Sequence, residues 1–209
     1  MLTGPNVIDA AQITGVILAG GRGARMGGVD KGLQIFNGVP LAQRALERLQ
    51  LQVGIAAIIA NRNIAEYEAF GVPVWRDAID DFAGPLAGMH AALAHCTTAW
   101  LATAPCDSPL LPLDLVERLA SAAQGQNAEI AIASARQDDG ELRSQPVFCL
   151  MRAELVEHLA SYLQTGGRKV QAWMALHRTV TVAFDQPGDD PRAFFNANTM
   201  AQLHRLERT

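Results

Sequence analysis

The sequence predicts a three-layer α/β domain with a mostly parallel sheet. Short apolar runs typical of buried strands alternate along the chain with amphipathic helical segments. The first such strand leads into a glycine-rich loop, and later strands end at polar residues, on the edge where open α/β sheets bind ligands. No repeat, low-complexity run or linker divides the 209 residues. We therefore expect a flexible extension over residues 1–12 and one domain over residues 13–209.

The first strand, Val16–Ala19, is followed at once by a loop rich in glycine and in cations. Arg22 and Arg25 lie within this loop and Lys31 lies just beyond it; its glycines are Gly20, Gly21, Gly23, Gly27 and Gly28. Glycines let a ligand approach the main chain, whose N–H groups can then point into one concavity that suits an anion. The cations complement phosphate oxygens. The loop is therefore predicted to cradle a nucleoside triphosphate, although its spacing matches neither the P-loop nor the dinucleotide pattern.

The next segments predict a hairpin, a helix and a buried strand. A short strand over 33–36 precedes Asn37-Gly38, a strong two-residue turn signal. A helix is expected from Pro40 to Val53, because proline suits the first helical position and apolar residues recur at four-residue spacing. The apolar run 55–60 predicts a strand buried on both faces, which ends at the polar sequence Asn-Arg-Asn.

Two further strands end at carboxylates. A strand over 72–75 is followed by Asp77, and a strand over 100–104 is followed by Asp107 between two prolines. The segment between these strands predicts a helix over 86–95 rich in small residues. Asp107 either caps the following helix or binds Mg²⁺ together with phosphate oxygens. The phosphate cradle at another strand end of the same sheet favours the metal.

The rest of the chain continues the alternation of strands and helices. We expect helices over 113–124, 153–164 and 170–176, strands over 129–135, 146–151 and 180–184, and a last helix from Thr199 towards Arg208. A small basic loop, Gly166-Gly167-Arg168-Lys169, is either a solvated turn or a contact for a second substrate.

Composition excludes several classes of protein. A net charge of −4 argues against general nucleic-acid binding, and no apolar run approaches the length that spans a bilayer. The three cysteines are widely spaced and form no C-x-x-C pair. They favour a reduced, cytoplasmic protein over a disulfide scaffold or a zinc site.

The glycine-rich segment resembles a known signature. Leu18-Ala19-Gly20-Gly21, Arg25-Met26-Gly27-Gly28 and Asp30-Lys31 are similar to the first motif of nucleotidyltransferases with a glycosyltransferase-A-like, Rossmann-type fold. The whole set, from residue 13 to the C-terminus, resembles the molybdenum cofactor guanylyltransferases. It adds Asn61-Arg62, Asp77, Gly84-Pro85-Leu86-Ala87-Gly88, Pro105-Cys106-Asp107-Ser108-Pro109 and Asn196-x-Asn198-Thr199. The chain departs from the pattern at Gln145-Pro146, where His-Pro is expected.

The resemblance implies an enzyme that transfers GMP from GTP to the terminal phosphate of molybdopterin, forming molybdopterin guanine dinucleotide and pyrophosphate. It implies Mg²⁺ on Asp107 and catalytic roles for Arg25, Lys31 and Asp107. The resemblance implies GTP contacts at Leu18, Ala19, Gly20, Lys31, Asn61, Asp77 and Asp107. Gly21, Arg22 and Asn198 are further candidate binding residues. Whether Asp77 contacts guanine or ribose stays open. Implied protein partners are cofactor-insertion chaperones and other proteins of cofactor biosynthesis; no nucleic acid or membrane is expected.

The implied chemistry needs no general base. The attacking phosphate monoester has a second pKa near ~6 and is largely ionised at neutral pH. The site must instead align the reactants and neutralise negative charge. The alternatives are a cytidylyltransferase acting on the same cofactor, a sugar-phosphate nucleotidyltransferase, and a non-catalytic carrier of nucleotide or cofactor. The presence of both Lys31 and Asp107 favours an enzyme over a carrier.

Overall fold

The computed structural model describes residues 8–19, 30–77, 84–137 and 139–196, together with positions 202, 203 and 206. Its large sheet is formed by β1 (Ile13–Leu18), β4 (Ile55–Ile59), β5 (Val74–Trp75), β6 (Trp100–Pro105), β7 (Ile130–Arg136), β8 (Leu142–Arg152) and β9 (Thr179–Phe184). A separate hairpin consists of β2 (Ile35–Phe36) and β3 (Val39–Pro40). The helices are α1 (Leu41–Gln50), α2 (Ile64–Glu68), α3 (Pro85–His95), α4 (Leu115–Gly125), α5 (Val156–Gln164) and α6 (Val170–Met174). The described residues also include the 3₁₀ turns η1 (Ala10–Gln12), η3 (Lys31–Leu33) and η4 (Ala153–Leu155).

The seven strands of the large sheet lie in the order β5-β4-β1-β6-β8-β7-β9. The first four are mutually parallel, so their carboxyl ends meet at one edge of the sheet. β8 is inserted antiparallel between β6 and β7, while β7 and β9 are parallel. The β7–β8 register shifts next to Pro146, which has no N–H to donate to a ladder. The sheet is mixed and mostly parallel, which confirms the predicted fold class.

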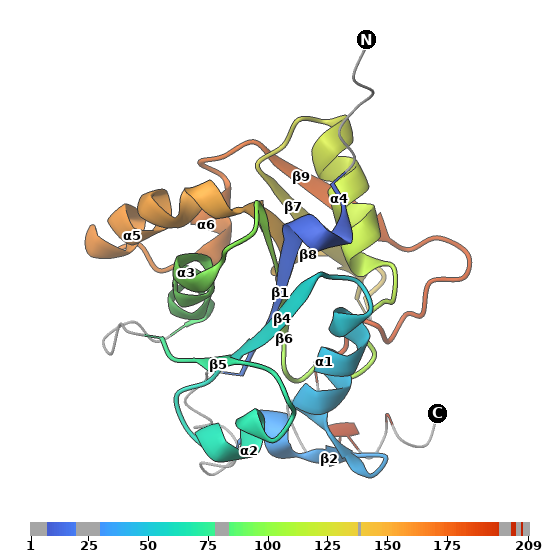
Figure 1. Cartoon of the computed structure of the whole chain (residues 1–209). Coiled ribbons are helices and arrows are strands. Elements are labelled where there is room, and N and C mark those ends of the chain that lie inside the picture. Colours follow the sequence, from blue (N-terminus) through green and yellow to red (C-terminus); the bar gives the residue numbers. More distant parts are fainter. Residues whose placement is uncertain are drawn as a thin grey trace.

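Helices cover both faces of the sheet, which makes three layers (Figure 1). α1 and α4 pack on one face, where Leu46, Leu49 and Leu119 are buried with strand residues such as Ile17. α3, α5 and α6 pack on the other face in a second core that includes Trp173. The predicted apolar stripe of α1 is therefore the face that it buries.

The small residues of α3 allow close packing, as expected. A Cβ placed on Gly88 would lie 3.4 Å from Leu18 Cδ2 and 3.6 Å from Ile59 Cγ2, which is the limit of ordinary contact. The helix therefore lies directly against the ends of β1 and β4, the two strands that lead into the predicted site.

Several element boundaries differ from the predictions. α1 begins at Leu41 with Pro40 as its N-cap, and it ends at Gln50 rather than at Val53. The strand predicted over 33–36 begins only at Ile35, because the preceding residues form η3. The strand after α1 is buried on both faces only over its last three residues, since Ile55 is 40% exposed. Helix α2 was not predicted at all.

The two ends of the described chain pack on the domain. Within the predicted extension, Asp9 caps η1, and the Gly54 N–H donates to the Ala10 carbonyl at 2.7 Å. Leu203 and Leu206 are buried against the β2–α1 region.

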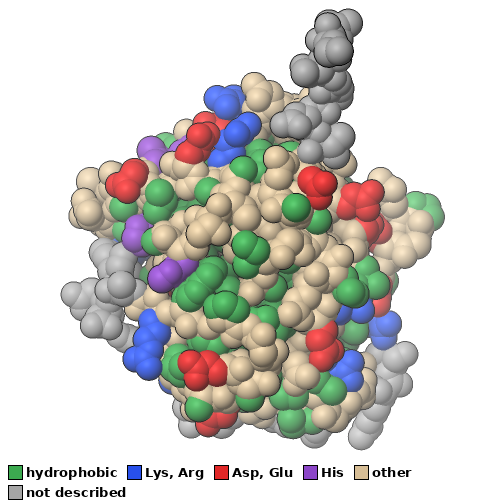
Figure 2. Space-filling view, viewed as in Figure 1, with side chains coloured by type: hydrophobic (Ala, Val, Ile, Leu, Met, Phe, Trp, Pro, Cys, Tyr) green, Lys and Arg blue, Asp and Glu red, His purple; other side chains and the backbone are tan. Residues whose placement is uncertain are grey.

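No helix among the described residues is both long enough and apolar enough to cross a bilayer. On the face drawn in Figure 2, acidic and basic side chains lie in small mixed groups rather than in one extended basic surface.

Candidate functional site

Apart from Lys31, which begins η3, the described residues of the predicted site lie at the carboxyl ends of four neighbouring parallel strands. Leu18 is the last residue of β1, whereas Asn61, Asp77 and Asp107 each lie two residues past the end of β4, β5 and β6. The strand order β5-β4-β1-β6 places them in a row along one edge of the sheet. Polar side chains beyond these strand ends therefore face a common region, the usual ligand position in open α/β sheets.

The end of β1 is fixed by the strands on both of its sides. The Ala19 N–H donates to the Ile59 carbonyl at 2.8 Å, and the Cys106 N–H donates to the Leu18 carbonyl at 3.2 Å. Leu18 and Ala19 are buried. The chain is therefore rigidly held where it enters the glycine-rich segment. Gly20, Gly21, Arg22, Arg25 and Asn198 lie outside the described residues, and the roles assigned to them stay predictions.

Lys31 and Asp107 come together from distant parts of the sequence. Lys31 Nζ lies 3.5 Å from Asp107 Oδ2, and the two side chains are 24% and 14% exposed. Burial raises the pKa of the Asp107 carboxyl above its ordinary value, and the nearby Lys31 ammonium opposes this shift. The pair places one cation and one largely buried carboxylate beside the strand end that precedes the glycine-rich segment.

The residue before Lys31 is the centre of a buried polar network that sequence reasoning missed. Asp30 is 7% exposed and caps η3, whose first residue is Lys31. Its Oδ1 accepts hydrogen bonds from the Gly32 N–H at 3.1 Å and the Tyr67 hydroxyl at 2.7 Å; its Oδ2 accepts one from Asn63 Nδ2 at 2.9 Å and lies 3.4 Å from Arg62 Nε. The available signal was the polar run Asn61-Arg62-Asn63 after a buried strand, because polar side chains in such a position indicate a hydrogen-bonding partner nearby.

Asn61 and Asp77 bind each other across the ends of β4 and β5. Asn61 Nδ2 donates to Asp77 Oδ2 at 3.1 Å, and the Asp77 N–H donates back to Asn61 Oδ1 at 3.0 Å. These reciprocal bonds set the orientation of the amide and hold a carboxylate at the edge of the sheet. Such a carboxylate can accept hydrogen bonds from N–H or O–H groups of a ligand.

The C-terminal segment reaches the same edge beside Asp107. Ser108 is completely buried, and its hydroxyl donates to Asn196 Oδ1 at 2.7 Å. Phe194 packs edge-on against Phe148 and Phe184, with ring centroids 4.8 and 5.1 Å apart. The segment that leads to the predicted Asn198 is therefore attached to the loop that carries Asp107.

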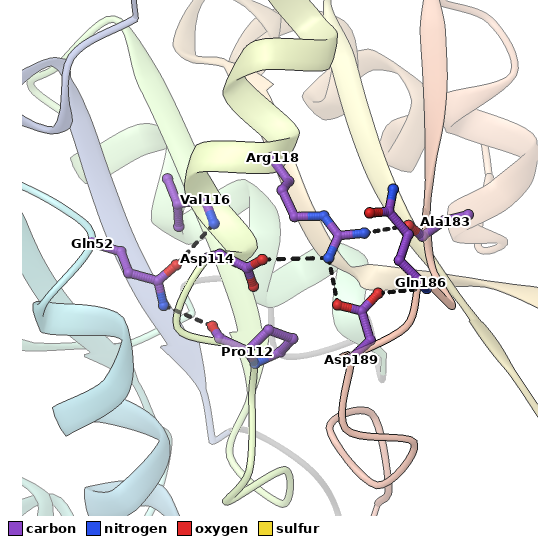
Figure 3. A network of polar contacts seen from close by, with 8 residues as sticks. All are labelled: Gln52, Pro112, Asp114, Val116, Arg118, Ala183, Gln186 and Asp189. Carbon is purple, nitrogen blue, oxygen red and sulfur yellow. Dashed lines mark hydrogen bonds and ion pairs between the residues drawn. The ribbon is translucent and has the colours of Figure 1, made fainter.

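A polar network fixes the start of this C-terminal segment (Figure 3). Arg118 of α4 points between two carboxylates, with Nη1 2.8 Å from Asp189 Oδ1 and 3.3 Å from Asp114 Oδ2. Its Nη2 donates to the Ala183 carbonyl in β9. Gln52, just after α1, donates to the Pro112 carbonyl at 2.9 Å and so holds the loop before α4.

Asp107 offers a carboxylate of the kind that Mg²⁺ binds together with phosphate oxygens. Among the described residues, no group of three or more His, Cys, Asp or Glu side chains is placed to hold a metal by itself. Mg²⁺ commonly takes only one or two protein carboxylates, together with phosphate oxygens and water. The neighbouring Cys106 is buried, and burial raises the pKa of its thiol, as is typical of structural cysteines.

Comparison with known proteins identifies the family. The profile of the MobA-like NTP transferase domain matches residues 15–182. The molybdenum cofactor guanylyltransferase of Albidiferax ferrireducens is 59% identical over 207 residues, which cover 96% of this chain and 98% of that protein. The chain belongs to the molybdenum cofactor guanylyltransferase family. The member from Bordetella petrii is 56% identical over 96% of this chain and 100% of its own length.

Solved structures confirm the fold of this family for the chain. Molybdopterin-guanine dinucleotide biosynthesis protein A from Archaeoglobus fulgidus superposes with a TM-score of 0.74 at 22% identity, covering 93% of this chain and 97% of its own. The 4-diphosphocytidyl-2C-methyl-D-erythritol synthase of Anaerococcus prevotii gives a TM-score of 0.73 at 10% identity, covering 96% and 98%. The chain is a nucleotidyltransferase of molybdenum cofactor biosynthesis, as the resemblance of its motifs implied.

Proposed function

We propose that this guanylyltransferase carries out its transfer with Lys31 and Asp107 as the central charged pair. The terminal phosphate of molybdopterin attacks the α-phosphorus of GTP, and the products are molybdopterin guanine dinucleotide and pyrophosphate. The observation that carries the proposal is the 3.5 Å approach of Lys31 Nζ to Asp107 Oδ2, beside the strand end that leads into the glycine-rich segment.

The pair supplies the charges that phosphoryl transfer needs. Lys31 neutralises negative charge on the phosphates, with Arg22, Arg25 and the N–H groups of Gly20 and Gly21 as further donors. Asp107 would hold a Mg²⁺ ion, which when bound neutralises phosphate charge and helps to orient the triphosphate. The attacking phosphate is already ionised near neutral pH, so alignment rather than proton removal is the task of these residues.

Other residues of the sheet edge bind the nucleoside and the second substrate. The Asp77 carboxylate, oriented by Asn61, is complementary to the adjacent N–H donors of guanine and to ribose hydroxyls. The backbone at Leu18 and Ala19 lies at the entry to the loop. Asn198 follows Asn196, which is already bonded to the loop of Asp107, so this side suits the acceptor substrate.

A direct assay tests this function. Pyrophosphate release is measured with the purified protein, Mg²⁺ and molybdopterin, and with GTP, CTP, ATP and UTP in turn. Release with GTP alone supports the proposal. Release with CTP would overturn the base specificity while keeping the mechanism. Binding of GTP without any release would favour a carrier.

The cellular setting completes the proposal. All three cysteines of the chain are free thiols, as is typical of proteins in the reducing cytoplasm. We place the enzyme there, with cofactor-insertion chaperones and other biosynthetic proteins as its partners. Cell fractionation with an antibody to the protein tests the location.

A further inference from the structure

We propose that Tyr67 and Asn63 are positioning residues of the transfer reaction, which fix the Asp30 carboxylate and through it Lys31. This inference rests on the proposed function of Lys31. Neither residue belongs to the motifs that mark the nucleotide site, and Tyr67 comes from α2, the helix that lies beside the sheet edge near β5 (Figure 1).

Tyr67 makes a hydrogen bond that its packing does not require. Its side chain is completely buried and packs edge-on against Phe70 at 5.7 Å between ring centroids, as a phenylalanine would also do. Its hydroxyl nevertheless donates to Asp30 Oδ1 at 2.7 Å, a short bond to a carboxylate. Burial, with a smaller contribution from this bond, raises the pKa of the phenol. The hydroxyl therefore stays a donor to Asp30 at any physiological pH.

The Asn63 side chain binds the same carboxylate instead of capping its own helix. It is the N-cap of α2 in the left-handed region, with φ 50° and ψ 40°, and its side chain makes no capping bond. Its Nδ2 instead donates to Asp30 Oδ2 at 2.9 Å. A left-handed backbone is uncommon outside glycine, although asparagine tolerates it, and such residues cluster at functional sites. The backbone of residue 63 is thus arranged to aim the side chain at Asp30.

Gly32 leaves the space that the Tyr67 hydroxyl occupies. A Cβ at position 32 would lie 2.4 Å from Tyr67 Oη and 3.2 Å from Ala42 Cβ. Because the hydroxyl is buried and bonded to Asp30, it cannot give way without losing that bond. Glycine is therefore needed here for space. Both neighbours of Lys31 therefore take part in this contact, since Asp30 accepts the bond from Tyr67 and Gly32 leaves room for the hydroxyl.

These contacts restrain the position of the Lys31 backbone. Asp30 caps η3 through the Gly32 N–H, while Tyr67 and Asn63 hold its two oxygens from the side of α2. Because the carboxylate is bonded at both oxygens and also caps η3, these bonds restrain the backbone at Lys31, whose Nζ lies 3.5 Å from Asp107 Oδ2. Lys31 acts most strongly on charge that develops in the transition state, so its displacement should lower kcat more than it weakens GTP binding.

The test is Tyr67→Phe in the full-length enzyme, with Tyr162→Phe as the matched control. Tyr162 is the only other tyrosine of the chain, and its hydroxyl donates to the Lys169 carbonyl at 3.3 Å. We expect Tyr67→Phe to lower kcat about tenfold, with the KM for GTP changed less than about threefold. The control should retain wild-type kcat. Asn63→Gly, which keeps the left-handed backbone, should lower kcat in the same way even if Tyr67→Phe fails to fold.

A second set of variants separates positioning from a purely structural role. In a Lys31→Ala background, Tyr67→Phe and Asn63→Gly should cause no further loss of kcat, because the residue that they position is gone. Losses as large as in the wild-type background would overturn the proposal, as would wild-type kcat in both single variants. An inactive wild-type enzyme would refute the proposed function instead, so the two failures are distinguishable.

Discussion

Replacing Asp107 with asparagine should remove activity without removing stability. The substitution keeps the shape of the side chain and deletes its charge, the proposed anchor of Mg²⁺. Loss of one preorganised group at developing charge typically lowers kcat by about 10²–10³, or roughly 3–4 kcal/mol of barrier. We expect a loss of at least this size at saturating Mg²⁺.

The expected stability follows from the balance of forces on the carboxylate. At 3.5 Å from Lys31, the gross attraction is about 5 kcal/mol for an effective dielectric constant of about 20. The pKa of Asp107 is nevertheless raised, so desolvation outweighs this attraction and the charged form is disfavoured in the folded protein. Each unit of raised pKa corresponds to about 1.4 kcal/mol. Asparagine has no charge to desolvate.

The effect of Asp107→Asn on the free energy of unfolding should depend on pH. A carboxyl with a raised folded pKa stabilises most at a pH below its unfolded value of 3.8, and this contribution is lost as the pH rises through the folded pKa. The wild type loses this stabilising contribution as the pH rises, whereas Asp107→Asn has no carboxyl to titrate. The free energy of unfolding of the variant, relative to that of the wild type, should therefore increase as the pH rises above 3.8, and the difference should level off once the pH exceeds the folded pKa.

Denaturant unfolding at several pH values and pyrophosphate release measure the two effects. Asp185→Asn is the matched control, because Asp185 also follows a strand end and is ion-paired, 2.7 Å from Arg136 Nη2. It should keep wild-type activity. If Asp107→Asn turned over within about threefold of the wild type, the metal-binding role would be wrong. If it lost more than about 1 kcal/mol of stability at pH 7, the balance of forces described above would be wrong.

Three further outcomes are expected. Lys31→Ala should lower kcat/KM at least about 100-fold. Lys169→Ala in the second basic loop should change kcat/KM less than about threefold. Equal effects of the two variants would mean that the phosphates lie elsewhere. Asp77→Asn should raise the KM for GTP about tenfold, with a smaller effect on kcat. Asn61→Ala should also raise this KM, because Asp77 then loses its orienting partner. Unchanged KM values in both variants would mean that the nucleoside binds elsewhere. Burial, with help from a histidine neighbour, lowers the pKa of His177, so its contribution to stability is present above pH 6.5 and lost as the pH falls through the lowered value. His177→Gln should flatten the stability curve across that window in denaturant titrations, and an unchanged acid slope would contradict the shift.

The arrangement of the sheet followed from local patterns in the chain. Apolar runs bounded by turn residues predicted every strand of the large sheet, because a strand covered on both faces needs such a run. The polar residues after β4, β5 and β6 were then expected to gather, since parallel strands end at the same edge. Their regular position, two residues past each strand end, is a direct result of that geometry.

The network around Asp30 was not predictable in the same way. Its partners are separated from it by 33 and 37 residues, and α2 is too short to show a helical period in the sequence. A buried carboxylate next to a lysine resembles an ordinary helix cap until the donors that surround it are known. Likewise, the left-handed backbone of Asn63 leaves no signal in a single sequence, since asparagine is common in loops of every kind.

The positions of Lys31 and Asn196 suggest why Asp107 is central. The loop that carries Asp107 meets Lys31 on the side of the nucleotide segment, 3.5 Å away, and meets the C-terminal segment through the bond between Ser108 and Asn196. Arg118, through Asp189, and the packing of Phe194 on Phe148 hold that segment against α4 and β8. Asp107 thus lies between the residues proposed for the donor nucleotide and those proposed for the acceptor. In-line transfer requires both substrates to be aligned on one phosphorus, and a carboxylate on the loop between the two proposed binding regions would suit that task.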